Sequence, residues 1–213
     1  MKIRSITCFY DPGISNAENT LETLSILSKQ SKQICEENGY EVQTLRLATI
    51  PFSMIQPKND GDEIIQLTKS MEVNARISGF DYLSLGPALF SHPHSYHVIN
   101  DLIAATEITF FSGMIADQVN GINMEAVKNC AEIIYKNATI ESNGFANLRF
   151  SALANVKPFG PFFPGSYHQV GQPPSISLAI EGADEVVRAF QIAKSLNEAR
   201  QLLLENLEHH ANQ

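Results

Sequence analysis

The chain has 213 residues, of which 44% are hydrophobic and 18% charged, a mixture ordinary for a globular protein that excludes a disordered or collagen-like chain. With 15 Lys and Arg against 23 Asp and Glu, the net charge is −8. This is the wrong sign for a protein that binds nucleic acid or an anionic membrane. The length favours a single domain over residues 1–213.

Short strand-like runs alternate with helical patterns along the chain. The predicted strands are residues 2–9, 41–49, 82–85, 108–115, 148–156 and 175–180. The predicted helices cover residues 15–39, 64–77, 99–103, 123–134 and 183–209. Ser15 and Glu18 predict a capping box, and Ser95 and Asn123 predict two further helix caps. The alternation predicts an α/β fold, with a mostly parallel sheet of about six strands and covering helices.

Cysteine usage and hydropathy bear on the cellular compartment. The three cysteines are odd in number and form no CxxC pair, so a secreted disulfide framework is not expected. No apolar segment follows the early basic residues Lys2 and Arg4, and no apolar run reaches the roughly 18–20 residues of a membrane helix. These features favour a reduced, cytoplasmic setting without a membrane partner.

One connection breaks the strand–helix alternation. Residues 157–174 hold five of the ten prolines and no helical pattern. A structureless loop of this length is uncommon in a compact domain and is usually functional or disordered. The segment also holds aromatic residues that favour burial: Phe159, Phe162, Phe163 and Tyr167. We therefore expect an ordered, functional loop.

Several predicted strands alternate apolar residues with small polar ones, which is not typical of strands buried on both faces. In the last strand, for example, Ser175, Ser177 and Glu181 alternate with Ile176 and Leu178. One face of the sheet should therefore be apolar and covered by helices, and the other small and polar. The polar face has three interpretations: a solvated surface, a barrel interior or cleft that binds a ligand, or a subunit interface.

Charged and polar residues on this face supply candidates for a binding site. Guanidinium groups suit a carboxylate or phosphate, to which they bind in bidentate fashion. The ligand-binding candidates are Arg46, Arg149, Asn155 and Ser177. The candidates for acid–base chemistry are Tyr167, His168 and Glu181. Alternatively, the two arginines pair with Glu181 and merely hold the sheet together.

A second cluster lies after the third predicted strand, in SHPHSYH (residues 91–97). His92, His94 and His97 are candidate ligands of a divalent metal ion, with His168 as a fourth. The alternative is that they are solvated or capping loop residues. No other cofactor is predicted, since the chain has no G-x-G-x-x-G, G-x-S-x-G or H-E-x-x-H motif.

Four stretches resemble a known family. They are EVQTLRLATIPF (41–52), FDYLSLGP (80–87), NGFANLRFSALANVKPFGPFFPGSYH (143–168) and ISLAIEGADEV (176–186). They are similar to the uncharacterised prokaryotic proteins of "domain of unknown function 711". The resemblance implies a barrel like that of pyruvate formate-lyase, in which two parallel half-sheets run in opposite directions. Typical members are about twice as long as this chain, so the resemblance implies a half-barrel similar to their N-terminal half.

Glycyl-radical chemistry is not expected to accompany this fold. It needs a glycine loop near the C-terminus and a cysteine relay, whereas this chain has no glycine after Gly182 and no cysteine after Cys130. We expect instead a protein that binds a small anionic metabolite on the polar face, and a catalytic form of this hypothesis adds turnover of that metabolite. The alternative is a non-catalytic structural or regulatory subunit that docks a partner, and a third is a metal-dependent enzyme at the histidine cluster. A two-fold homodimer would supply two half-sheets.

Overall fold

The computed structural model describes residues 1–55 and 61–212. Its strands are β1 (Lys2–Tyr10), β2 (Leu45–Thr49), β3 (Tyr82–Ala88), β4 (Thr109–Asp117), β5 (Gly121–Ile122), β6 (Phe150–Ala154) and β7 (Ser175–Glu181). Its α-helices are α1 (Ala17–Glu37), α2 (Phe52–Ile55), α3 (Gly61–Ser78), α4 (Ile99–Ala104), α5 (Met124–Asn137), α6 (Phe145–Leu148), α7 (Ala183–Ile192) and α8 (Leu196–Ala211). A short 3₁₀-helix, η1, covers Pro93–Tyr96. The predicted α/β class is confirmed.

The strands form one sheet of seven, in which β5 is a two-residue strand paired with the end of β4. β1, β2, β3, β4 and β6 are parallel and lie side by side in chain order. β7 lies beside β1 and runs antiparallel to it. The described strands do not close into a barrel: β7 and β6 lie at opposite sides of the sheet.

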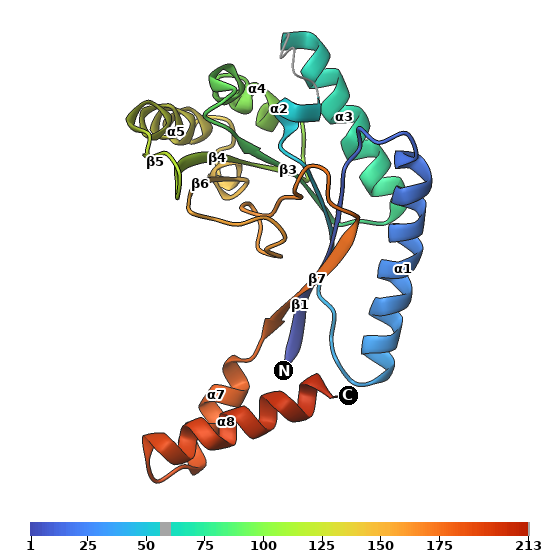
Figure 1. Ribbon diagram of the computed structural model, residues 1–213, viewed down its shortest axis with the longest axis vertical. Helices are drawn as coiled ribbons and strands as arrows, with labels where there is room; N and C mark the ends of the chain where they lie inside the picture. The colour runs from blue at the N-terminus through green and yellow to red at the C-terminus, as the bar shows by residue number, and fades with distance from the viewer. Residues whose placement is uncertain (56–60, 213) are drawn as a thin grey trace.

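Because successive parallel strands are neighbours, right-handed connections place their helices on one face of the sheet. Figure 1 shows α1, α3, α4 and α5 around the outside of the curved sheet. The strands contribute Ile6, Cys8, Leu47, Leu83, Leu85 and Phe111 to the core on this side, all at most 1% exposed. The helices contribute Leu24, Ile64, Met71, Leu102 and Ile133. The predicted apolar, helix-covered face is therefore confirmed.

The last two helices form a separate feature, which we call the arm (α7 and α8). They pack on each other and lie beyond the end of β7, with the end of α8 close to the end of α1 (Figure 1). The prediction of one helix over residues 183–209 is wrong. The chain turns at residues 193–195, where the Ser195 side chain accepts a hydrogen bond from the Glu198 N–H and starts α8.

The predicted caps have mixed outcomes. Asn123 caps α5, since its side chain accepts a hydrogen bond from the Ala126 N–H at 2.9 Å. The predicted box at Ser15 is wrong, because α1 starts after Asn16 and no side chain caps it. Ser95 lies inside η1 and its hydroxyl donates to the His92 carbonyl, so it does not cap α4.

Candidate functional site

Residues 157–174 cover the polar face of the sheet, opposite the helices (Figure 1). Hydroxyls on the strands donate to carbonyls of this segment: Ser84 to Ser166 at 2.6 Å, and Ser177 to Phe159 at 2.9 Å. The backbone N–H of His168 donates to the Thr49 carbonyl at 2.9 Å. The polar residues of the strands therefore hold an ordered loop, so Ser177 is already engaged with the protein itself.

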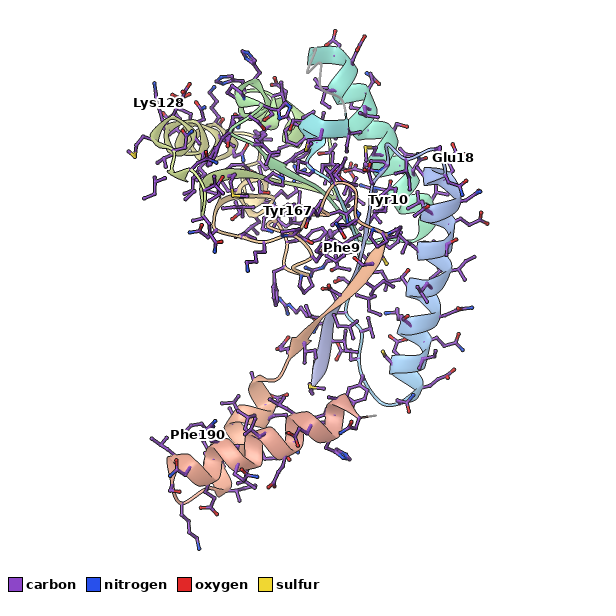
Figure 2. All side chains as sticks on the ribbon, viewed as in Figure 1. Phe9, Tyr10, Glu18, Lys128, Tyr167 and Phe190 are labelled. Atoms are coloured by element: carbon purple, nitrogen blue, oxygen red, sulfur yellow. The ribbon has the colours of Figure 1, made fainter. Side chains whose placement is uncertain are left out.

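Aromatic rings complete the attachment of this loop. The ring of Phe159 lies 5.6 Å from that of Phe9 and 5.2 Å from that of His168, measured between centroids. Phe163 packs on Phe110 at 5.4 Å. Figure 2 shows Phe9 of β1 and Tyr167 of the loop near the middle of the molecule. The prediction of an ordered loop, made from its aromatic content, is therefore confirmed.

The loop leaves part of the polar face open, and a cavity of about 580 Å³ lies there. Its lining is Arg4, Arg46, Phe162, Phe163, Ile180 and Glu181. Four of these residues come from β1, β2 and β7, and the two phenylalanines come from the loop. Charged side chains of both signs thus line this open cavity together with apolar ones.

Arg46 is the half-buried cation of this cavity. Its guanidinium lies 5.2 Å from the ring centre of Phe163 and 5.7 Å from that of Tyr82, within cation–π range. Its Nε donates to the Thr44 hydroxyl at 2.9 Å. Burial lowers the pKa of Arg46, although an arginine stays charged in proteins. Across the described residues, its two terminal nitrogens have no hydrogen-bond or ion-pair partner, so they are free to bind an anion.

Arg4 and Glu181 lie at the exposed rim of the same cavity. Nη1 of Arg4 is 3.4 Å from a carboxylate oxygen of Glu181 and 3.2 Å from the Gln43 side-chain oxygen. Both partners of this ion pair are about half exposed, so it contributes little to stability. Because Arg4 already neutralises Glu181, Arg46 supplies the uncompensated positive charge of the cavity.

Sequence comparison identifies the family. The model of the family "Uncharacterised ACR (DUF711)" matches residues 1–213. The chain belongs to the DUF711 family. A UPF0210 protein of Methanopyrus kandleri is 30% identical over 81% of this chain and 40% of its own length. UPF0210 proteins of Clostridium botulinum (27% identical; 85% of this chain, 41% of theirs) and Acetivibrio thermocellus (25%; 90% and 47%) also match. The chain spans less than half the length of these curated relatives.

The predicted acid–base residues of this DUF711 chain do not lie together. The Tyr167 hydroxyl donates to the Val156 carbonyl at 2.9 Å, and burial raises its pKa. His168 is fully buried, which lowers its pKa, and its Nε2 contacts the Gln172 carbonyl at 3.0 Å. The His168 N–H is hydrogen-bonded to Thr49, which pairs with Tyr10 at the end of β1. Glu181 pairs with Lys2 at the start of β1. These two ends of β1 are eight positions apart along the strand, or roughly 26 Å.

Two of the predicted ligand-binding residues lie elsewhere. Arg149 is 2% exposed and donates to the carbonyls of Thr106 (2.9 Å) and Ile103 (2.8 Å), beside the end of α4. It also pairs with Glu141 at 3.2 Å. The expectation that Arg46 and Arg149 line one pocket is wrong, because Arg149 precedes β6 and is not on the polar face. Asn155 is exposed, follows β6 and does not line the cavity.

The histidine cluster shows no convergent arrangement. The rings of His94 and His97 are 6.5 Å apart, and the Nδ1 of His92 lies 3.0 Å from the Ser91 hydroxyl. Residues 1–55 and 61–212 contain no group of three or more His, Cys, Asp or Glu side chains placed to hold a metal ion. Metal binding at this cluster stays a prediction. Within the same ranges, no helix has the length and hydropathy needed to cross a lipid bilayer.

Sequence reasoning missed Arg4 as a member of the cavity. Strict alternation along β1 would place Arg4 on the helix-covered face with Ile6 and Cys8. The pairing of β1 with β7 shifts register between Ile3 and Ser5, however, and the irregularity turns Arg4 toward the cavity. Phe162 and Phe163 lie in the loop that is predicted to be functional, and aromatic residues in a long loop next to a polar face are typical of a binding site.

Proposed function

We propose that the protein binds a small anionic metabolite in the cavity beside Arg46. The observation that carries this proposal is the half-buried guanidinium of Arg46, which has two free terminal nitrogens in a cavity of about 580 Å³. Such a group offers two parallel N–H donors to a carboxylate or phosphate. Phe163 and Tyr82 fix its plane before any ligand arrives, which reduces the entropy lost on binding.

The rest of the cavity narrows the ligand to one with an apolar part. Phe162, Phe163 and Ile180 line the same space, and Phe162 is 67% exposed at its edge. We expect the anionic group to bind Arg46 and the remainder of the ligand to pack on these side chains. Because Tyr167 and His168 lie far from Glu181, the proposal is for binding, with no catalytic step assigned.

Isothermal titration with inorganic phosphate and with benzoate tests this proposal. Replacing Arg46 by Gln should weaken the binding of either probe about ten- to a hundred-fold, because a charge-assisted hydrogen-bonding group is lost. Arg46→Lys should bind with intermediate affinity, since it keeps the charge but loses the planar fork. Lys128→Gln removes an exposed charge on α5 and serves as the control (Figure 2). Equal affinities of the wild type and Arg46→Gln, or no binding of either probe, would contradict the proposal.

A second candidate is a subunit that pairs with another copy to complete a barrel. Two features support it: five parallel strands in chain order with β7 reversed at their edge, and described strands that do not close. All three cysteines are free thiols, which suits the intracellular location we also propose. Light scattering tests the pairing: we expect twice the chain mass of 23.5 kDa, and a monomer at every concentration would contradict it.

A further inference from the structure

The three charged residues of the cavity come from three neighbouring strands. Arg46 lies on β2 and Glu181 on β7, and these strands flank β1, which supplies Arg4. Nη1 of Arg4 lies 3.4 Å from a carboxylate oxygen of Glu181, on one side of it. Arg46 enters the same cavity from the other side. Arg4 is therefore the middle one of three charged groups that share one space.

The charges of this lining add up to one positive charge. Arg4 and Arg46 are cations, Glu181 is an anion, and the other three lining residues are uncharged. In the described chain, all six lining residues belong to strands or to the loop, so no helix N-terminus adds positive potential. Because Glu181 offsets Arg4, the cavity has positive charge to match a single negative charge on a ligand.

The charge of Arg4 also acts on Arg46. Burial is the main cause of the lowered pKa of Arg46, and Arg4 lowers it further, whereas Tyr82 and Asp81 act in the opposite direction. Arg4 and Arg46 therefore lie within electrostatic range of each other. While Glu181 is paired with Arg4, it weakens the positive potential that Arg4 would otherwise add at an anion held by Arg46.

This charge balance favours one kind of anionic head group. Nε of Arg46 donates to the Thr44 hydroxyl, which leaves the two terminal nitrogens for a ligand. A carboxylate has two oxygens and one negative charge, so it matches both the fork and the charge. A phosphate monoester carries close to two charges above pH 7. Its second charge would lose hydration in a half-buried site without gaining a partner.

We propose that the cavity selects a ligand with one negative charge, a monocarboxylate with an apolar body, and that Glu181 determines this selectivity by occupying Arg4. The inference rests on the proposed binding at Arg46 and adds the class of ligand and a specificity-determining residue. Selective sites often contain an element that repels the wrong ligand, and Glu181 is that element here. Since Arg4 and Glu181 are about half exposed, we expect a difference in affinity of about five-fold.

Isothermal titration with three aryl probes at about pH 8 tests the selectivity. Benzoate and phenyl sulfate carry one negative charge, whereas phenyl phosphate carries close to two. Phenyl sulfate and phenyl phosphate have nearly the same shape, so the difference between them reports charge alone. Benzoate should bind at least as tightly as phenyl sulfate, and phenyl phosphate about five-fold more weakly than either. Any other order would overturn this inference and leave the proposed anion binding intact. No binding of any probe would overturn both.

Glu181→Gln tests the assigned role by a gain of binding. It frees Arg4, so phenyl phosphate should bind about ten-fold more tightly than it binds the wild type. Phenyl sulfate should gain only about two-fold, and the preference for it should disappear. Glu132→Gln is the control, because it removes a half-exposed glutamate from the ion pair with Lys128 on α5 (Figure 2). An unchanged preference in Glu181→Gln, or the same shift in Glu132→Gln, would overturn the role of Glu181.

Arg4→Gln keeps the inference testable if Glu181→Gln fails to fold. The Arg4 side chain is 58% exposed, and its loss leaves Glu181 without a cation and the lining without a net positive charge. All three probes should bind more weakly, and phenyl phosphate should lose the most affinity. Lys128→Gln, which removes a cation from α5, should change none of the affinities. Unchanged binding by Arg4→Gln, or a smaller loss for phenyl phosphate than for phenyl sulfate, would overturn the inference.

Discussion

The body of the molecule (residues 1–181) and the arm differ in how they bury apolar side chains. In the body, strands and helices contribute more than twenty buried apolar residues to one continuous cluster. In the arm, Ala189 and Ala199 are the buried apolar residues, and large aliphatic side chains face water. The body therefore has a continuous apolar core, whereas the arm has almost no buried apolar core of its own.

The two regions also use buried polar groups differently. In the body, buried groups such as Glu72 have several partners: its carboxylate accepts hydrogen bonds from the N–H groups of Glu107 and Ile108 and from the Thr109 hydroxyl. In the arm, the buried Glu185 lies at the joint with the body. Glu185 joins α7 to α8 through Asn206 and joins the arm to the body through the amino group of Met1, so one buried carboxylate serves both contacts.

A matched pair of leucine truncations gives the largest expected difference between these regions. Leu102→Ala removes a fully buried side chain from α4 and should lower the free energy of unfolding by about 3–4 kcal/mol. Leu196→Ala removes a 76% exposed side chain from the arm and should lower it by less than about 0.5 kcal/mol in dilute protein. Urea unfolding measures both. A similar loss for the two variants would contradict the comparison.

Arg149 and Arg200 allow the same comparison for a charged side chain, one buried in the body and the other exposed on the arm. Arg149→Leu leaves the carbonyls of Thr106 and Ile103 and the partly buried Glu141 without their donor, and should cost about 3 kcal/mol of unfolding free energy. Arg200→Leu on the arm surface should cost less than about 0.5 kcal/mol. Chemical denaturation of the two variants measures the difference, and a mild effect of Arg149→Leu would show that its buried network is not structural.

Replacing a glycine by alanine should give a smaller difference in stability between the body and the joint with the arm. At Gly86 in β3, φ is +69° and an added Cβ would lie 2.9 Å from the Cα of Pro51, so Gly86→Ala should destabilise the body by about 2 kcal/mol. At Gly182, before the arm, a Cβ would meet only Leu207, at 4.0 Å. Gly182→Ala should therefore change the melting temperature little. Equal shifts in melting temperature for the two variants would argue against the crowding at Gly86.

How far the sequence predicts this molecule also differs between body and arm. Period-two alternation in the strands identified the apolar and polar faces, and hence Arg46 and Glu181, because alternation follows directly from strand geometry. It failed for Arg149 and Arg4. Arg149 lies just before its strand begins, and the irregularity between Ile3 and Ser5 reverses the side on which Arg4 lies. Neither event has a signal in the composition of one chain.

In the arm, the wrong prediction concerned where one helix ends and the next begins. The pattern S-x-x-E occurs at Ser15–Glu18 and at Ser195–Glu198, and the first predicted a capping box that does not form. At the second site, the Ser195 side chain accepts from the Glu198 N–H at 3.2 Å, and the Glu198 carboxylate accepts from the N–H of Lys194, the residue before the N-cap, at 2.7 Å. These hydrogen bonds start α8 at Leu196, whereas α7 ends at Ile192, so residues 183–209 hold two helices.

Removing the serine of each S-x-x-E motif gives the smallest predicted loss of stability, with one motif serving as the control for the other. Ser195→Ala removes the acceptor that caps α8 and should destabilise the arm by about 1 kcal/mol, whereas Ser15→Ala should have almost no effect because Ser15 caps no helix. Hydrogen exchange of the amides of α8 measures the local loss. Faster exchange confined to the arm would mean that the arm opens independently of the body. Faster exchange throughout the chain would mean that the contacts of Glu185 and His210 join the two regions into one cooperative unit.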